Sequence, residues 1–171
     1  MPIVKIDNLL IRPYRLADID SLVHHANDRE VWLNVRDRFP HPYTRKDASE
    51  WIEIAGDAEP AVNFAIVVDD QCVGGIGIAF NQDVNRKSAE IGYWLGKELW
   101  GKGVMSRLLK PASDYYFSHH DLVRLYAIVF DWNPASARVL EKSGYEFEGR
   151  LKKAAFKDGK FCDQLLYAYI K

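Results

Sequence analysis

The sequence predicts one mixed α/β (α+β) domain over residues 1–171, in which a mostly antiparallel sheet of six to seven strands is flanked by about four helices. Short runs rich in β-branched and aromatic residues alternate with stretches whose apolar residues recur at helical spacing. Hydrophobic residues fill 48% of the 171 positions, which is enough for one sizeable core. No linker, repeat or low-complexity segment divides the chain, so we expect a single domain.

The first third of the chain predicts a short strand and two helices. The strand covers residues 9–14 and ends at a proline, and the first helix, with aspartates in its first turn, covers residues 16–26. Thr44 resembles an N-cap for the second helix, which we expect to run through residue 54. The segment between the two helices, residues 31–43, is expected to be irregular.

Three antiparallel strands are predicted next. Residues 64–68 and 72–80 are rich in β-branched residues, and the polar turn Asp69-Asp70-Gln71 joins them, which indicates a hairpin. A polar loop then leads to the third strand, at residues 90–95.

The second half of the chain predicts a helix, a strand, a second helix and two closing strands. Asn133 and Pro134 open the second helix, and Gly144 follows its last turn. The expected elements are a helix from about residue 104 to 117, a strand at 122–130, a helix at 135–142, and strands at 145–150 and 161–170.

Charge and hydropathy argue against several classes of protein. The 23 basic and 24 acidic residues give a net charge of −1, so no global field attracts nucleic acid or an anionic membrane. The apolar runs are too short to span a membrane, and the N-terminus lacks the features of a signal peptide. We therefore expect a cytoplasmic protein. Cys72 and Cys162 lie in apolar, strand-like surroundings and are predicted to be buried free thiols.

A glycine-containing turn, Trp100-Gly101-Lys102-Gly103, lies between a predicted strand and a predicted helix. Such a turn offers backbone N–H groups at the positive end of the helix dipole, where a phosphate or pyrophosphate binds. An ordinary strand-to-helix connection would be compatible with the same two glycines. The spacing matches neither the P-loop nor the dinucleotide-binding fingerprint.

The order of the elements, this turn and a string in the last third of the chain resemble the GNAT N-acetyltransferase superfamily. That string is Asn133-Pro134-Ala135-Ser136-Ala137-Arg138-Val139-Leu140-Glu141-Lys142-Ser143-Gly144-Tyr145. Within the superfamily, three further strings resemble the branch that includes the RimJ and RimL ribosomal-protein N-terminal acetyltransferases: Leu10-Ile11-Arg12-Pro13, Pro42-Tyr43-Thr44 and Glu90-Ile91-Gly92-Tyr93-Trp94. The resemblance covers almost the whole chain and implies a GNAT-like fold and an acyltransferase activity.

The resemblance implies acetyl-CoA as a co-substrate. The family's phosphate motif, Gln/Arg-x-x-Gly-x-Gly/Ala, falls on residues 98–103, where Glu98 departs from the usual Gln or Arg. In the family the pantetheine arm pairs with the backbone of the strand before the motif, like an added strand. The expected cofactor-binding residues are Tyr93, Trp94, Leu95, Trp100, Gly101, Lys102, Gly103, Val104, Met105, Asn133, Ser136 and Arg138. For Lys102 and Arg138 a solvated surface charge is the alternative, and for the side chains of Tyr93 and Leu95 it is core packing.

Three residues are candidates for catalysis: Glu90, Ser136 and Asn133. Glu90 is expected to act as the base, directly or through water, unless it pairs with Arg12 or a lysine. Ser136 matches a serine near the coenzyme A sulfur, where a hydroxyl can protonate the departing thiolate. Asn133 matches a ligand to the cofactor or to a water near the thioester, although an N-cap alone would explain it. Leu140 stands where many relatives carry a tyrosine, so another residue or solvent can also be the acid.

The acceptor amine is expected between residues 31–43 and a hairpin at residues 153–160. The candidate substrate-binding residues are Trp32, Phe39, His41, Tyr43 and Asp163, with core packing or strand bridging as the alternatives. Relatives that act on ribosomal proteins can carry a glutamate before the last strand, where this chain has Ala155-Phe156. No metal is expected, because the paired histidines at 24–25 and 119–120 have no evident ligand partner in the sequence.

These features predict an acetyl-CoA-dependent N-acetyltransferase that works by direct attack of a primary amine. A protein or peptide N-terminal amine is the expected acceptor, because its pKa of about 7.7 to 8.0 leaves it partly neutral near pH 7, unlike a lysine at about 10.4. The alternatives are a small-molecule amine of the polyamine or aminoglycoside type, and a non-catalytic acyl-CoA-binding module. We expect no nucleic acid or membrane partner, and either a monomer or a homodimer.

Overall fold

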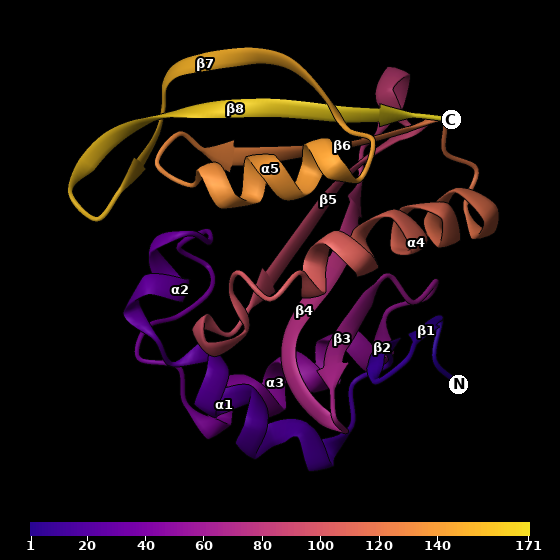
Figure 1. The fold of residues 1–171 in the computed structure, drawn as a ribbon, viewed down its shortest axis with the longest axis vertical. Coiled ribbons are helices and arrows are strands. Elements are labelled where there is room, and N and C mark those ends of the chain that lie inside the picture. Colours follow the sequence, from indigo (N-terminus) through magenta and orange to yellow (C-terminus); the bar gives the residue numbers. More distant parts are fainter. The chain divides into compact units, whose positions relative to one another are not determined.

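The computed structural model describes all 171 residues and confirms the predicted mixed α/β class. Eight strands form the sheet in the order β1-β2-β3-β4-β5-β6-β8-β7 (Figure 1), one or two more than the sequence predicts. The residues group into two compact units, the first made of 1–77 and 93–104 and the second of 78–92 and 105–171. Each helix is either too short or too polar to span a bilayer.

The first unit contains an antiparallel run of strands. β1 (Val4–Ile6) pairs with β2 (Leu9–Arg12), which pairs with β3 (Asn63–Val68), which pairs with β4 (Gln71–Phe80). The predicted hairpin of β3 and β4 is confirmed. Its turn residues, Asp69 and Asp70, have φ of +48° and +64°, as a tight two-residue hairpin turn requires.

Three helices belong to the same unit: α1 (Ile19–Ala26), α2 (Arg29–Leu33) and α3 (Arg45–Asp57). Figure 1 shows α1 and α3 lying side by side. The predicted Thr44 cap is confirmed, because its side chain accepts the Asp47 N–H and the Asp47 carboxylate accepts the Thr44 N–H. The expectation that residues 31–43 are wholly irregular is wrong at their start, where α2 forms behind an Asp28 N-cap.

The core of the first unit forms where the helices cover the strands. Its buried members include residues of α1, α3, β3 and β4, and Tyr14, Phe39, Trp51 and Trp94 pack against them. The backbone of Gly74 lies so close to the end of β5 that an added Cβ would come within 2.3 Å of the Trp94 carbonyl oxygen. A glycine is therefore required at this point of β4.

A buried ion pair fixes the start of α1. The Arg12 guanidinium donates two hydrogen bonds of 2.7 Å to the Asp18 carboxylate, and the two side chains are 5% and 6% exposed. The Asp18 carboxylate also accepts the Arg15 N–H at 2.8 Å. The bond to Asp18 raises the pKa of Arg12 above its ordinary value.

The second unit contains two helices, three strands and the first part of β5. β5 (Ser88–Leu95) runs parallel to β6 (Arg124–Phe130), with pairing over Ser88 to Glu90, and β6 continues antiparallel to β8 (Lys160–Ile170) and then β7 (Glu146–Lys157). Figure 1 shows β7 and β8 as one long hairpin, with α5 (Pro134–Lys142) beside it and α4 (Val104–His119) before β6 in the chain. Cys72 in the first unit and Cys162 in the second are buried free thiols, as predicted.

Candidate active site

The glycine turn lies at the start of α4, as the sequence predicts. A 3₁₀ turn, Lys97–Leu99, precedes it, and Gly101 and Gly103 have φ of +72° and +74°. These are left-handed conformations that glycine adopts without steric cost. A Cβ built at either glycine would meet no atom within 4 Å, so the surface above the turn is open.

Part of the turn's hydrogen-bonding capacity is used internally. The Trp100 N–H donates to the Lys97 carbonyl at 3.1 Å and the Lys102 N–H to the Leu99 carbonyl at 3.4 Å. The first N–H groups of α4, starting at Val104, have no acceptor within the helix, because the preceding turn of helix does not exist. No acidic residue lies in the first turn of α4, so its positive dipole end is not neutralised from within.

Hydrogen bonds hold the turn against the strand before it. The indole Nε1 of Trp100 donates to the Leu95 carbonyl oxygen at 2.7 Å, and the Gly96 N–H donates to the Val73 carbonyl at 2.8 Å. Lys97 forms an ion pair with Glu30 of α2, with 2.5 Å between Nζ and Oε1. Two backbone carbonyls, of Leu95 and Val73, and the Glu30 side chain of α2 thus fix where the glycine turn begins.

Glu98, the residue that departs from the family pattern, contacts His24 of α1. Its Oε1 lies 3.1 Å from His24 Nε2. The sequence favours surface or capping positions for both histidines. His24 is exposed, in agreement with this, and has the Glu98 carboxylate as a partner, whereas His25 is only 7% exposed. Burial lowers the pKa of His25 below its ordinary value, and His24 lowers it further, whereas Glu98 acts in the opposite direction.

The N-terminus of α5 brings together Asn133 and Ser136. Asn133 is the N-cap, and its Oδ1 accepts the Ser136 backbone N–H at 3.2 Å, so the predicted capping role is confirmed. Ser136 is half-buried and Arg138 is exposed. Leu140 is fully buried, so an apolar core side chain occupies the position where many GNAT enzymes carry a tyrosine.

Glu90 lies in the paired part of β5, opposite Tyr126 of β6. It is half-buried. Arg12, one of the alternative partners expected for Glu90, forms its ion pair with Asp18 instead.

The aromatic residues predicted to line the acceptor site separate into two pairs. Trp32 and His41 stack with ring centroids 5.9 Å apart, and His41 is exposed. Phe39 contacts Tyr43 at 5.0 Å between centroids and Trp94 at 5.3 Å, and Tyr43 is buried in the core. Trp32 and His41 are thus the more accessible pair.

Asp163 bridges strands in the second unit. Its carboxylate accepts the Arg150 Nε–H at 2.5 Å and the Lys153 N–H at 2.7 Å, and Arg150 also donates to Asp131 at 3.0 Å. The Lys153 and Arg150 hydrogen bonds hold the pKa of Asp163 below its ordinary value. This geometry favours the strand-bridging alternative for Asp163 over contact with substrate.

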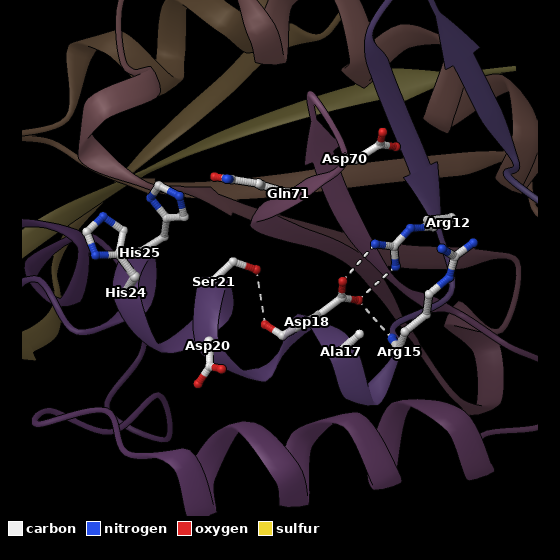
Figure 2. Close-up of a pocket in the computed structure, with 10 residues that line it drawn as sticks. All are labelled: Arg12, Arg15, Ala17, Asp18, Asp20, Ser21, His24, His25, Asp70 and Gln71. Atoms are coloured by element: carbon white, nitrogen blue, oxygen red, sulfur yellow. Dashed lines mark hydrogen bonds and ion pairs between the residues drawn. The ribbon is translucent and has the colours of Figure 1, made fainter.

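A separate cavity of about 440 Å³ lies in the first unit (Figure 2). Arg12 and Asp18 form one end, with Arg15 beside them, and the imidazoles of His24 and His25 lie at the other. None of the residues that the sequence analysis assigns to acetyl-CoA or to the acceptor lines this cavity.

Comparisons with known proteins identify the family. A model of the acetyltransferase (GNAT) domain matches residues 8–146. An uncharacterized N-acetyltransferase, p20, from Bacillus licheniformis is 30% identical over 96% of this chain and 94% of its own length. The ribosomal-protein-serine acetyltransferase of Escherichia coli is 35% identical over 63% of this chain and 59% of its own length.

The fold comparison agrees. The solved structure of RimL, a ribosomal L7/L12 α-N-protein acetyltransferase in complex with coenzyme A, matches 99% of this chain and 98% of its own with a TM-score of 0.86 and 21% identity. The fold and the sequence matches together define an acetyltransferase. This chain belongs to the GNAT family and is an N-acetyltransferase.

Proposed function

We propose that the protein transfers the acetyl group of acetyl-CoA to the N-terminal α-amine of a protein or peptide. The observation that carries the cofactor half of this proposal is the open turn at Gly101 and Gly103, which leads into a helix whose first N–H groups have no acceptor within the helix. A pyrophosphate is an anion of the kind that such a helix start binds.

The remaining cofactor contacts follow from the family pattern. The N–H groups of Gly101, Gly103, Val104 and Met105 bind the pyrophosphate, while those of Trp100 and Lys102 keep the turn in shape. Lys102 is exposed and adds a positive charge beside the phosphates. The backbone of Tyr93 to Leu95 pairs with the pantetheine arm, and Asn133, Ser136 and Arg138 contact the cofactor from α5.

The reaction is direct attack of the amine nitrogen on the thioester carbonyl carbon. The carbon–sulfur bond breaks, the coenzyme A thiolate leaves and takes a proton from Ser136 or solvent, and Glu90 or a water removes the proton of the attacking amine. For an α-amine, deprotonation at pH 7.4 costs only about 0.4 to 0.8 kcal/mol, whereas a lysine side chain costs about 4 kcal/mol. The site has no tyrosine acid, and its candidate base is one half-buried glutamate. Such a site suits an amine that is already partly neutral, which an α-amine is.

Two relatives support this choice of acceptor. The Escherichia coli relative is a ribosomal-protein-serine acetyltransferase, and the RimL structure is that of an α-N-protein acetyltransferase. For this chain we propose the same chemical class of acceptor, a protein N-terminus, and leave its sequence to experiment.

Release of free coenzyme A thiol across a panel of acceptors tests the proposal. Peptides with a free N-terminus, N-terminally blocked peptides, polyamines and aminoglycosides would each be incubated with acetyl-CoA and the protein. We expect thiol release above background only with free N-termini. Release with the small amines alone would assign the activity to small-molecule acetylation instead.

Placing a side chain in the glycine turn should weaken acetyl-CoA binding. We expect Gly103→Val to lower the affinity at least tenfold, which corresponds to about 1.4 kcal/mol, because the new side chain occupies the open surface where the pyrophosphate approaches. Calorimetric titration with acetyl-CoA measures the change, and circular dichroism checks the fold.

The hairpin turn between β7 and β8 offers a matched control. Gly159 has φ of +76° and open space around its Cβ position, so Gly159→Val carries the same backbone strain as Gly103→Val. It should bind acetyl-CoA like the wild type. Equal affinity for acetyl-CoA in the Gly103 and Gly159 variants would show that the pyrophosphate does not bind at the glycine turn.

The role of Glu90 should depend on the pKa of the acceptor. We expect Glu90→Gln to lower kcat less for a peptide α-amine than for a lysine-like amine, because the α-amine is already partly neutral. Steady-state rates on both acceptors from pH 7 to 9 measure this difference. An equal loss on both acceptors at every pH would exclude Glu90 as the base.

A further inference from the structure

Two histidines and a glutamate lie close together in the first unit, and the two histidines also line one end of the cavity. His24 and His25 come from the last turn of α1, and Glu98 comes from the 3₁₀ turn before the glycine turn. One ligand atom from each side chain lies within 4.8 Å of the others. Two imidazoles and a carboxylate are a donor set suited to Zn²⁺.

We propose that His24, His25 and Glu98 form a site for a divalent cation of the Zn²⁺ type, which ties α1 to the turn that precedes residues 100–103. This site is distinct from the acetyl-CoA contacts and from the acetyl-transfer chemistry. It also departs from the expectation, drawn from the sequence, that the protein has no metal site.

The separations between the donor atoms fit a zinc ion after small side-chain rotations. Zinc bonds of about 2.0 to 2.2 Å place the ligands of a tetrahedral site about 3.3 Å apart. His24 Nε2 and Glu98 Oε1 are already 3.1 Å apart. The third donor has to approach by at most about 1.5 Å to reach the tetrahedral separation.

One ligand is fixed and two are free to adjust. The buried ring of His25 lies against Gly96, where an added Cβ would come within 2.4 Å of the His25 Nδ1. The side chains of His24 and Glu98 are 64% and 67% exposed and can rotate toward a common ion. The ring centroids of His24 and His25 lie 4.8 Å apart, with an angle of 77° between the ring planes (Figure 2).

Three protein ligands would leave a fourth position of a tetrahedral ion open. That position would be filled by water or by a small anion, and the cavity gives it access (Figure 2).

Zinc titration of the protein without coenzyme A tests the site, because the coenzyme thiol itself binds zinc. We would measure Zn²⁺ affinity by competition with a chromogenic chelator in the wild type, His24→Gln and Glu98→Gln. Both substituted side chains are exposed, so the fold should survive. We expect one Zn²⁺ per wild-type chain and at least tenfold weaker binding in each variant.

A second histidine pair provides the matched control. His119 is exposed at the end of α4, next to His120 and Asp121, and resembles the pair at 24–25 in sequence. His119→Gln should bind zinc like the wild type. Wild-type affinity in Glu98→Gln, or an equal loss in His119→Gln, would overturn the proposed site, as would the absence of binding by the wild type.

A second readout follows from mass action. Zinc bound only by the folded state should raise the melting temperature of the wild type and of His119→Gln, but raise that of Glu98→Gln much less. Cobalt in place of zinc adds a spectroscopic check, since a site with nitrogen and oxygen ligands should give visible absorption in the wild type that Glu98→Gln loses. Equal thermal shifts in all the variants would contradict the proposal.

Discussion

Removing the Asp18 carboxylate should lower the free energy of unfolding by about 3 to 5 kcal/mol, the loss typical of breaking a buried ion pair. Asp18→Ala leaves the Arg12 guanidinium buried without a counter-charge and removes the acceptor of the Arg15 N–H. Urea unfolding measures the change, and a constant m-value would show that the unfolding transition itself is unaltered.

An exposed ion pair on α3 is the control for this prediction. Lys46 and Glu50 lie 3.5 Å apart with side chains 81% and 56% exposed, so Glu50→Ala should cost only about 0.3 to 0.5 kcal/mol. The double variant Arg12→Met with Asp18→Leu should recover much of the loss, because it leaves no unpaired charge. If Asp18→Ala costs no more than Glu50→Ala, the pair does not hold α1 in place.

Replacing Ser136 by alanine should lower kcat by a factor of about 10², the lower end of the contribution typical of a group that transfers a proton in the transition state. Acetyl-CoA affinity should change little, because the Asn133 side chain bonds the backbone N–H of residue 136, which alanine keeps. A fall in kcat at unchanged acetyl-CoA affinity is the signature of an interaction made in the transition state.

Ser118 on α4 offers a serine with no proposed role in chemistry. It is exposed, and its hydroxyl bonds the Tyr115 carbonyl of its own helix. Ser118→Ala should turn over like the wild type. Wild-type turnover in Ser136→Ala at saturating substrate would remove Ser136 from the chemistry and leave solvent as the acid.

The elements predicted best from the sequence are those defined by local chemistry. The Thr44 and Asn133 caps and the Asp69-Asp70 turn each act on backbone groups within a few residues, so their signals are contained in the sequence around them. The glycine turn belongs to the same group, because the two residues with left-handed backbone conformations are both glycines and can be recognised in the sequence.

The strand boundaries missed by the sequence analysis lie at the two edges of the sheet. β1 has three residues, too few to show an alternating pattern. β7 was expected to end at Arg150 but runs to Lys157, and most of its residues are exposed, so it lacks the apolar face that identifies a strand. The short helix α2 has five residues, too few for helical spacing of apolar residues to show in the sequence.

Contacts between residues far apart in the sequence leave no local pattern from which to predict them. His24 and Glu98 are separated by 74 positions, and nothing local to either residue indicates the other. Arg12 and Asp18 are only six positions apart, but the sequence did not distinguish Asp18 from Glu90 as the partner of Arg12. These pairings depend on how α1 packs in the first unit, and that packing is set by the core as a whole.

The most direct test of the proposed function is to locate the acetyl group on a matched pair of peptides. One peptide has a free N-terminus and no lysine, and the other has the same sequence with a blocked N-terminus and one internal lysine. Mass spectrometry after incubation with acetyl-CoA should find the acetyl group on the α-amine of the first peptide, with the second left essentially unmodified. Acetylation mainly on the lysine of the second peptide would contradict the N-terminal assignment.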